Sequence, residues 1–434
     1  MAPRYALELV NRTLCDICND NRPFGGKIIV LGGDFRQLLP IKLNATRTET
    51  INLSIKFSKL WKHFKISSLT QNMRTLPEEV EFAEFVLSIG NGSINNEDDY
   101  VTLPQKCVAS KDADIVADVY ADAISNRQYD NFTMLAILSP RNIDVDLIND
   151  RVVNLLDAES EKIYNSVDST ENCDNGVINE SILVEYLNSI NPPNFPPHNL
   201  KLRLYSVIML VRNLSINEGL CNGTRLMVIE LGTTLLKCKI LTGDKVGDIV
   251  FINRITLYYD HAGAFTFKRR QFPVKLAFAM TINKAQGQTF NKIGIDLQKD
   301  VFNHGQLYVA MSRVKSWDSL KIYLNNDRSN DLKHMQLKEN ISNLEYSVRA
   351  DGISEASTVI IGDGESLYRE NNESSGVSEN DWSCSSSVNL IGTKKSIQSL
   401  GSNITEKHKS ALLEPSKTNL DMVVSLKIKD FYVS

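Results

Sequence analysis

Short apolar runs without an alternating pattern constrain the fold of this chain more than any other feature of its sequence. "KIIVLG" (27–32) and "TMLAILSP" (133–140) are continuous apolar runs, which are typical of strands buried on both faces of a parallel sheet. Helical patterns stand beside them: residues 3–19 carry apolar side chains at helical spacing, 78–92 form a second helix that glycines end, and a third runs from about 144 to 156. Strands that alternate with helices predict an α/β fold with a parallel sheet.

A different pattern occupies residues 216–272. The proline-rich stretch "NPPNFPPH" (191–198) precedes it as a connector. Short apolar segments then follow one another, separated by glycine or asparagine turns, and each has the length of a strand. This series predicts a small antiparallel β-barrel inserted into the α/β fold. The α/β pattern resumes with "VKLAFAMTINKAQGQTF" (274–290).

The C-terminal part of the chain has a much weaker pattern. Residues 330–347 have the composition of one polar helix. From residue 351 onward the chain is rich in Ser, Asn, Glu and Gly and poor in aromatic residues, so we expect it to be mostly disordered. The last apolar patch, "MVVSLKIKDFYV" (422–433), predicts either a strand or a short docking segment.

Composition places the chain among soluble globular proteins. Its 434 residues are 42% hydrophobic and 23% charged, and the formal net charge is -4, so a DNA-binding surface would have to be a local basic groove. The C-x-x-C pair Cys15 and Cys18 lacks the second pair or histidines of a zinc site, which favours plain helix residues and no metal site. No run approaches the roughly 18 apolar residues of a membrane span. We expect an intracellular protein.

The polar cluster at the end of the first strand is the first candidate site. Gly33, Asp34 and Gln37 directly follow the apolar run. An amide held just past a strand end can sense the γ-phosphate of a nucleotide or orient the attacking water. A polar loop without function explains the stretch equally well.

Two arginines are candidates for contacts with phosphate. Arg74 in "LTQNMRT" (69–75) follows an expected strand and could reach an outer phosphate, although a surface or salt-bridged arginine is the simpler interpretation. Arg313 in "HGQLYVAMSRV" (304–314) is expected to project from the far end of a helix and to stabilise charge in phosphoryl transfer. His304 alone is interpreted as a cap or a buried hydrogen-bonding residue.

The stretch "AMTINKAQGQTF" (279–290) is too polar for an ordinary core element. Short polar groups, Lys284 and Gly287 crowd the exit of an apolar strand. Such a cluster allows a phosphodiester backbone to approach closely. The pattern favours a functional loop.

Six sequences occur in one order: "GGDFRQLLP", "LTQNMR", "LSPRNIDVDLIN", "GLCNGTRL", "MTINKAQGQTF" and "HGQLYVAMSRV". Together they resemble the Pif family of DNA helicases, in the RecD/Pif branch of superfamily 1, and most closely the Pif-like helicases of animal genomes and Helitron transposons. The resemblance covers about residues 1 to 325. It implies an ATP-dependent enzyme that moves 5′ to 3′ on single-stranded DNA, unwinds duplexes with ATP and Mg²⁺, and serves DNA repair, recombination and telomere maintenance.

The resemblance also implies residue roles. The implied catalytic residues are Gln37, Arg74 and Arg313. The residues implied to contact the nucleotide are Gly33, Asp34, Gln37, Arg74, Gln286, Gly287 and Arg313. The residues implied to contact DNA are Pro140, Asn142, Thr281, Asn283 and Lys284.

The implied architecture is that of P-loop, RecA-like motor domains. Residues 1–75 would be a remnant of the first motor domain, and 76–325 would be the second, with an SH3-like barrel at 216–272. Residues 326–434 would be the tail. The implied partners are single-stranded DNA and DNA junctions. The protein is implied to act as a monomer in the nucleus, with the mitochondrion as the alternative location.

Two elements of such a motor are missing from the 434 residues. Gly25-Gly26-Lys27 precedes a strand, whereas a phosphate loop, G-x-x-x-x-G-K-[ST], follows one and opens a helix. In the family, this lysine loop and the magnesium-binding Asp-Glu strand come before the Gln37 sequence, so we expect Met1 to fall just past them. Residues 1–72 would then leave sheet edges unpaired.

Three functional interpretations follow. The chain is a fragment of a Pif-family helicase, or it is a module that binds single-stranded DNA without turnover, helped by Lys268, Arg269 and Arg270 on the barrel. The third is a transposon relic that makes no functional protein.

Overall fold

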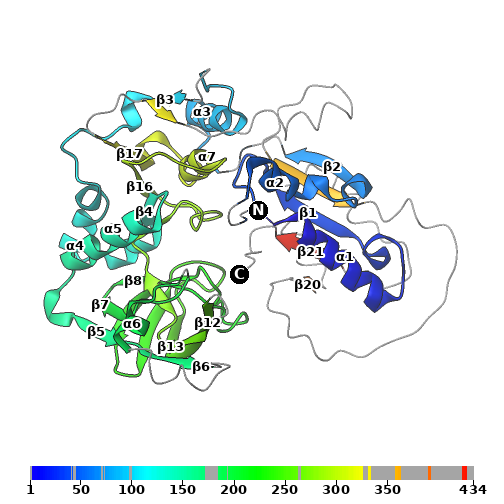
Figure 1. The fold of residues 1–434 in the computed structure, drawn as a ribbon. Coiled ribbons are helices and arrows are strands. Elements are labelled where there is room, and N and C mark those ends of the chain that lie inside the picture. Colours follow the sequence, from blue (N-terminus) through cyan, green and yellow to red (C-terminus); the bar gives the residue numbers. More distant parts are fainter. Residues whose placement is uncertain are drawn as a thin grey trace. The chain divides into compact units, whose positions relative to one another are not determined.

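The computed structural model divides the chain into two compact units (Figure 1). Unit 1 comprises Met1–Val101, Phe302–Val309 and Lys333–Ser434, and unit 2 comprises Thr102–Val301 and Ala310–Leu332. The residues that the structure describes are 2–40, 42, 45–69, 72, 74–96, 100–171, 184–192, 194–261, 265–325, 331–333, 357–362, 390–391 and 423–427.

Unit 1 contains a five-stranded sheet with the order β2-β19-β1-β21-β20. Strand β1 is Ile29–Gly33 and β2 is Phe64–Leu69. The helices are α1 (Arg4–Cys18), α2 (Arg47–Asn52) and α3 (Val80–Asn91). The predicted first strand and the predicted helices at 3–19 and 78–92 are therefore confirmed.

Helix α1 covers the sheet of unit 1 with its apolar face. Leu7 and Leu14 lie one above the other on the helix and are buried against Ile29 and Leu31 of β1 and Phe64 of β2. Burying each such side chain contributes about 1.5–3 kcal/mol. This packing fixes the direction of β1, and so the place where the Gly33 loop begins.

The expectation of unpaired sheet edges is wrong for β1. Strand β19 (Ser357–Gly362) pairs with it antiparallel, and β21 (Val423–Lys427) pairs with it parallel. Strand β20 (Leu390–Ile391) pairs with β21. Strands β19 and β21 are short runs rich in β-branched residues inside a polar segment, which gives them strand propensity. Strand β21 confirms the strand predicted in the last apolar patch.

The helix predicted at 330–347 is wrong where the structure describes it. Residues Asp331–Lys333 form strand β18, and the remainder of that range lies outside the described residues. Most of the tail expected to be disordered also lies outside them. Strand β3 spans Tyr100–Thr102.

Unit 2 contains a four-stranded sheet in the order β15-β4-β16-β17, and every neighbouring pair is parallel. Its strands are β4 (Leu135–Ser139), β15 (Ala279–Thr281), β16 (Lys292–Leu297) and β17 (Leu320–Leu324). The helices are α4 (Asp122–Ser125), α5 (Asn142–Leu155), α6 (Val184–Ser189) and, across the division between the units, α7 (Gln306–Met311). The predicted α/β fold with a parallel sheet is confirmed.

The antiparallel part of unit 2 forms more than one sheet. The first has the order β11-β10-β9-β8-β14, the second β12-β13-β6, and a third pairs β5 with β7. The strands are β5 (Lys162–Asn165), β6 (Val167–Glu171), β7 (Asn199–Leu202), β8 (Val207–Leu210), β9 (Arg225–Leu231), β10 (Leu235–Ile240), β11 (Ile249–Asn253), β12 (Ile255–His261), β13 (Phe265–Gln271) and β14 (Val274–Leu276). The strands expected within 216–272 are present. Two of them pair with strands from outside that range, β13 with β6 and β9 with β8, and β14 extends the first sheet by pairing with β8.

Candidate functional site

The loop after β1 is held as a tight turn by its own aspartate. The backbone N–H of Arg36 donates to Asp34 Oδ1 at 3.0 Å, and the N–H of Gln37 donates to the Asp34 carbonyl at 3.2 Å. The Arg36 guanidinium lies 3.7 Å from the same carboxylate and donates to Asn91 Oδ1 of α3 at 2.5 Å. The loop predicted to face a phosphate is therefore a preformed structure.

A second segment of unit 1, residues 302–309, lies against this loop. The Tyr308 hydroxyl donates to Asp34 Oδ2 at 2.7 Å. The His304 ring Nε2 lies 3.1 Å from the Phe35 carbonyl, and His304 is buried. The prediction that His304 is a buried hydrogen-bonding residue is confirmed.

Arg74 lies exposed at the start of the region that leads to α3. Its backbone N–H donates to Asn72 Oδ1 at 2.9 Å, which makes a turn at this point. The phosphate contact of the exposed Arg74 therefore stays a prediction.

In unit 2, the predicted DNA-contacting residues gather where the parallel strands end. Thr281 at the end of β15 is the register partner of Ser139 at the end of β4, and Pro140 and Asn142 come directly after Ser139. Because the carboxyl ends of parallel strands share one edge of a sheet, these residues and the loop after Thr281 lie together. Open α/β sheets bind their ligands at this edge.

Lys284 lies in the turn that follows β15, where its N–H donates to the Thr281 carbonyl at 2.9 Å. Burial lowers the pKa of the Lys284 ammonium, and the charge of nearby Lys275 lowers it further. Burial likewise lowers the pKa of Lys275, while Asp146 of α5 opposes that shift. A phosphate would relieve the repulsion between the two cations. Sequence reasoning missed Lys275, although a lysine inside the apolar run "VKLAFAM" was a usable signal.

Asp296 near the end of β16 is a second residue that sequence reasoning missed. It is 9% exposed, and it accepts hydrogen bonds from Ser139 Oγ and the Gln298 N–H, both at 3.3 Å. Burial raises the pKa of the Asp296 carboxyl. A buried acid at the ligand-binding edge would repel a phosphate when it is ionised.

Asp296→Asn is expected to raise the melting temperature of the chain by about 2–4 °C at neutral pH. A raised pKa in the folded state makes the carboxylate unfavourable above its ordinary pKa, and this cost disappears as the pH falls below that value. The gain should therefore vanish near about pH 3, where the carboxyl is protonated in both states. Calorimetry at the two pH values checks this, with exposed Asp150→Asn as the matched control. An equal gain at both pH values would show that ionisation is not its cause.

Arg313 does not project from the end of α7 as expected. It is 1% exposed, because α7 ends at Met311 and Arg313 turns back into the unit. Its guanidinium donates to the Gln288 carbonyl at 3.1 Å and to Ser312 Oγ at 2.6 Å. The Phe290 N–H donates to the Arg313 carbonyl at 2.9 Å. Arg313 is thus bound to the same loop that carries the predicted DNA contacts.

Gln286 and Gly287 lie in the same loop, between Lys284 and Gln288. The Gln286 N–H donates to the Asn283 carbonyl at 3.4 Å, and Gly287 is exposed with φ +84°. The predicted nucleotide contacts are divided: Gly33, Asp34, Gln37 and Arg74 belong to unit 1, and Gln286, Gly287 and Arg313 belong to unit 2.

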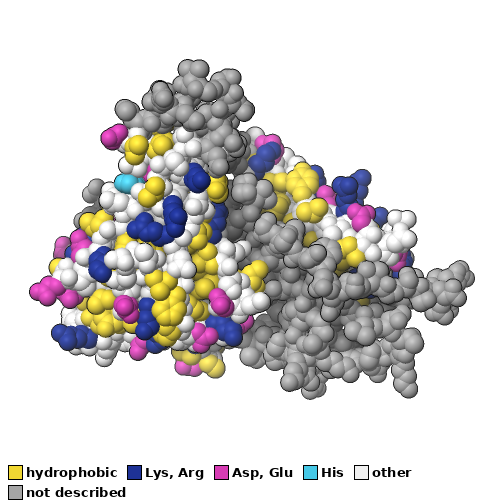
Figure 2. All heavy atoms as spheres, turned by 90° about the horizontal axis from the view of Figure 1, so that it is seen from below, with side chains coloured by type: hydrophobic (Ala, Val, Ile, Leu, Met, Phe, Trp, Pro, Cys, Tyr) yellow, Lys and Arg dark blue, Asp and Glu magenta, His cyan; other side chains and the backbone are white. Residues whose placement is uncertain are grey.

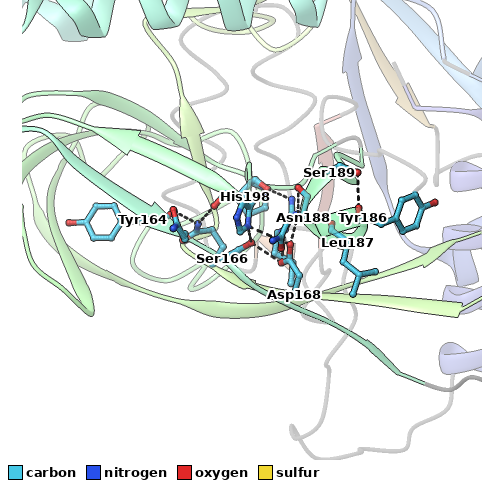
Figure 3. A network of polar contacts seen from close by, with 12 residues as sticks. Tyr164, Ser166, Asp168, Tyr186, Leu187, Asn188, Ser189 and His198 are labelled. Carbon is cyan, nitrogen blue, oxygen red and sulfur yellow. Dashed lines mark hydrogen bonds and ion pairs between the residues drawn. The ribbon is translucent and has the colours of Figure 1, made fainter. Parts of the chain in front are cut away.

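Arg269 cannot contact DNA as expected, because it is fully buried. Its guanidinium forms two hydrogen bonds with Asp168, Nε to Oδ1 at 2.9 Å and a terminal nitrogen to Oδ2 at 2.7 Å. Ser166 Oγ donates to Asp168 at 2.7 Å and lies 2.8 Å from His198 Nδ1 (Figure 3). In a hydrolytic triad the histidine lies between the serine and the aspartate, whereas here Ser166 lies between Asp168 and His198. The network is structural and joins β6 to β13.

No metal site is found among the described residues, since no group of three or more His, Cys, Asp or Glu side chains could hold an ion there. Cys15 and Cys18 are free thiols on α1. The described residues therefore offer no such group for the Mg²⁺ that the resemblance implies. No described helix is long and apolar enough to span a membrane.

Three family profiles match the chain. The profile described as PIF1-like helicase matches residues 1–100, DNA helicase Pif1, 2B domain matches 185–231, and one described as Helicase matches 268–360. ATP-dependent DNA helicase PIF1 of Xenopus laevis is 26% identical over 70% of this chain, and that of Homo sapiens is 28% identical over 73%. These matches support a Pif-family DNA helicase.

The chain spans 42% and 43% of the length of these two Pif-family relatives. The fold agrees with solved Pif1 helicases. Bacteroides Pif1 bound to ssDNA has a TM-score of 0.56 at 21% identity, covering 80% of this chain and 73% of that one. Pif1 from Candida albicans has a TM-score of 0.50 at 20% identity, covering 80% and 75%. The predicted RecA-like helicase fold is confirmed.

Proposed function

We propose that the chain is the part of an ATP-dependent 5′–3′ DNA helicase that holds single-stranded DNA and contacts the outer phosphate of the nucleotide. The relatives are named ATP-dependent DNA helicases, and one solved neighbour is Pif1 from Bacteroides in complex with ADP-AlF3 and ssDNA. The carrying observation is the edge of the parallel sheet in unit 2, where Thr281 and Ser139 end neighbouring strands beside Lys284.

At this edge the proposed DNA contacts have distinct tasks. Thr281 and Asn283 offer short polar groups to the phosphodiester backbone, and Lys284 supplies a positive charge that burial has already stripped of water. Asn142, exposed at the start of α5, lines the same edge, whereas Pro140 after the end of β4 is buried. These contacts would bind DNA of any sequence, because they are made with the phosphates and not with base edges.

The nucleotide contacts are proposed for Gln37, Arg74 and Arg313. Gln37 orients the attacking water, and the two arginines neutralise charge on the outer phosphate. Arg313 must first give up its hydrogen bond to the Gln288 carbonyl. Gln288 belongs to the loop with the proposed DNA contacts, residues 281–290, here called the DNA-contacting loop. This exchange would therefore link DNA binding to the nucleotide.

Hydrolysis also needs a phosphate loop, and the 434 residues contain no G-x-x-x-x-G-K-[ST] sequence. The test compares single-strand-dependent ATP hydrolysis by residues 1–434 with that of an extended chain, in which the phosphate-loop and Asp-Glu segment of a Pif1 relative precedes Met1. We expect hydrolysis only by the extended chain, and weak, salt-sensitive oligonucleotide binding by both. Catalytic turnover by residues 1–434 alone would contradict the proposal. A failure of both versions to bind DNA or hydrolyse ATP would favour a transposon relic.

The second candidate is a single-strand-binding module without turnover, favoured by the outer face of the β12-β13-β6 sheet. Tyr258 is 53% exposed there, and the Lys268 ammonium lies 5.6 Å from its ring. Tyr258 and Lys268 are register partners, and Arg270 stands two residues further along the same face. An exposed aromatic ring beside cations is a platform on which bases stack. In Figure 2, by contrast, basic and acidic side chains are interspersed over the face shown.

Replacing both Lys268 and Arg270 with alanine is expected to weaken oligonucleotide binding roughly 3–10-fold at moderate salt. The slope of log K against log salt should fall by about 1.4, since each lost phosphate contact on a single strand removes about 0.7. Fluorescence anisotropy over a salt series checks this. The matched control replaces Lys62 and Lys65, two exposed lysines of unit 1, and should change neither quantity. An unchanged slope in the Lys268/Arg270 variant would exclude this face.

For the whole protein we propose action as a monomer on single strands and DNA junctions in the nucleus, with roles in repair, recombination and telomere maintenance. The family resemblance supports these roles. Light scattering of the purified chain tests the monomer, and imaging of the tagged protein tests the nucleus, where an exclusively mitochondrial signal would contradict it.

A further inference from the structure

The segment directly before Arg313, residues 302–309, packs against the Gln37 loop. Within unit 1, residues 302–309 touch this loop through Tyr308 on Asp34 and through His304 on the Phe35 carbonyl. Gly305, at φ +72°, lies so close that an added Cβ would meet the Arg36 carbonyl oxygen and, at 2.8 Å, the Gln37 carbonyl carbon. Only glycine fits there without displacing the loop.

The Tyr308 contact differs from the others in being directional and charge-assisted. Its hydroxyl donates to one carboxylate oxygen of Asp34 at 2.7 Å, while the other oxygen accepts the Arg36 N–H at 3.0 Å. Tyr308 is 9% exposed, and the Asp34 side chain is 8% exposed. Hydrogen bonds to ionised acceptors in such sheltered places are among the stronger ones. The phenol therefore fixes the orientation of the carboxylate around which the turn to Gln37 is built.

The same stretch of chain is bound to the DNA-contacting loop at its other end. Within unit 2, Arg313 donates to the Gln288 carbonyl at 3.1 Å and accepts from the Phe290 N–H at 2.9 Å. Helix α7 connects Tyr308 covalently to this end. A shift of the DNA-contacting loop would thus act on the chain segment that carries Tyr308.

We propose that Tyr308 is a positioning residue that sets the Asp34–Gln37 turn and transmits to it the state of the DNA-contacting loop. The inference rests on the proposed function and adds to it the residue through which the Gln37 loop is controlled. In this proposal Tyr308 acts through its hydrogen bond to Asp34 and is assigned no contact of its own with DNA or nucleotide. The hydroxyl alone carries the effect, so Tyr308→Phe removes it while keeping the ring.

The experiment measures amide hydrogen exchange in the full 434-residue chain, with and without saturating oligo(dT). Without DNA, Tyr308→Phe is expected to speed exchange of the Arg36 amide roughly tenfold, while exchange in α1 stays as in the parent chain. With DNA, the parent chain should show slower exchange at Arg36 and Gln37. In Tyr308→Phe this slowing should be lost although oligo(dT) binds within twofold of the parent affinity.

Two controls separate positioning from plain packing. Tyr5→Phe removes an exposed hydroxyl in unit 1 and should change nothing. In an Asp34→Ala background, Tyr308→Phe should have no further effect, because the hydroxyl acts only through that carboxylate.

Each outcome decides the matter. Unchanged Arg36 exchange in Tyr308→Phe, or equal acceleration throughout α1, would overturn the positioning role. A parent chain that binds oligo(dT) without slower exchange at Arg36 and Gln37 would overturn the transmission. If the parent chain does not bind oligo(dT), the proposed function fails, and the exchange without DNA still decides whether Tyr308 sets the turn.

Discussion

Replacing Asp168 with alanine is expected to lower the free energy of unfolding of unit 2 by about 3–5 kcal/mol. The side chains of Asp168 and Arg269 are both fully buried, and they form a bidentate ion pair. Removal of the carboxylate leaves a guanidinium in the interior without its counter-ion. A guanidinium does not escape this cost by losing its proton inside a protein.

The remaining partners of Arg269 cannot replace Asp168. The guanidinium also donates to the carbonyls of Pro196 at 3.1 Å and Leu187 at 3.3 Å, which are neutral acceptors from the connector and α6. These bonds show why the loss would spread: Arg269 on β13 connects β6, α6 and the proline-rich connector. We expect the β12-β13-β6 sheet to detach in this variant.

Urea unfolding followed by far-UV circular dichroism measures the effect. Ser166→Ala is the matched control: it removes one neutral donor to the same carboxylate and should cost about 1 kcal/mol. Replacing Asp168 and Arg269 together with leucine and methionine should recover much of the loss, because no buried charge then remains. If Asp168→Ala cost no more than Ser166→Ala, the ion pair would not be what holds the sheet.

Local pattern was enough to predict the elements that position the site. The runs at 27–32 and 133–140 became β1 and β4. Strand β4 is buried almost throughout, as a continuous apolar run indicates, whereas β1 is buried only at Ile29 and Leu31. Helix α3 ends where Gly92 adopts φ +67°, as expected for a glycine past the last helical turn. Such signals lie within a few residues of one another, so a single sequence reveals them.

The errors concern charged residues whose partners are distant in the sequence. The period of two along "FTFKRRQ" places Lys268 and Arg270 on one face and Arg269 on the other, but Asp168, which makes burial of Arg269 tolerable, comes from β6. Arg313 likewise met the Gln288 carbonyl instead of solvent, because α7 stopped before it. The Tyr308–Asp34 hydrogen bond joins residues from opposite ends of the described α/β region, and no local pattern announces it.

Replacing Arg313 with alanine in the extended chain is expected to lower single-strand-dependent ATP hydrolysis roughly 10³–10⁵-fold, the range in which an arginine that stabilises transferring phosphoryl charge acts. Arg313→Lys should recover little, because lysine lacks the planar fork that binds phosphate in two places. Steady-state kinetics at saturating DNA measures the rate, and the loss should fall on kcat more than on KM, since the charge develops in the transition state.

Burial of Arg313 makes a second effect necessary in the same variant. Without the guanidinium, the Gln288 carbonyl loses its donor at 3.1 Å, so the DNA-contacting loop should loosen and oligonucleotide affinity should fall a few-fold at most. Lys284→Ala is the matched contrast, because it removes the proposed phosphate contact and spares Arg313. It should weaken DNA binding more than Arg313→Ala and lower kcat less once DNA is saturating. Equal losses of DNA affinity and kcat in both variants would mean that Arg313 supports the loop and takes no part in phosphoryl transfer.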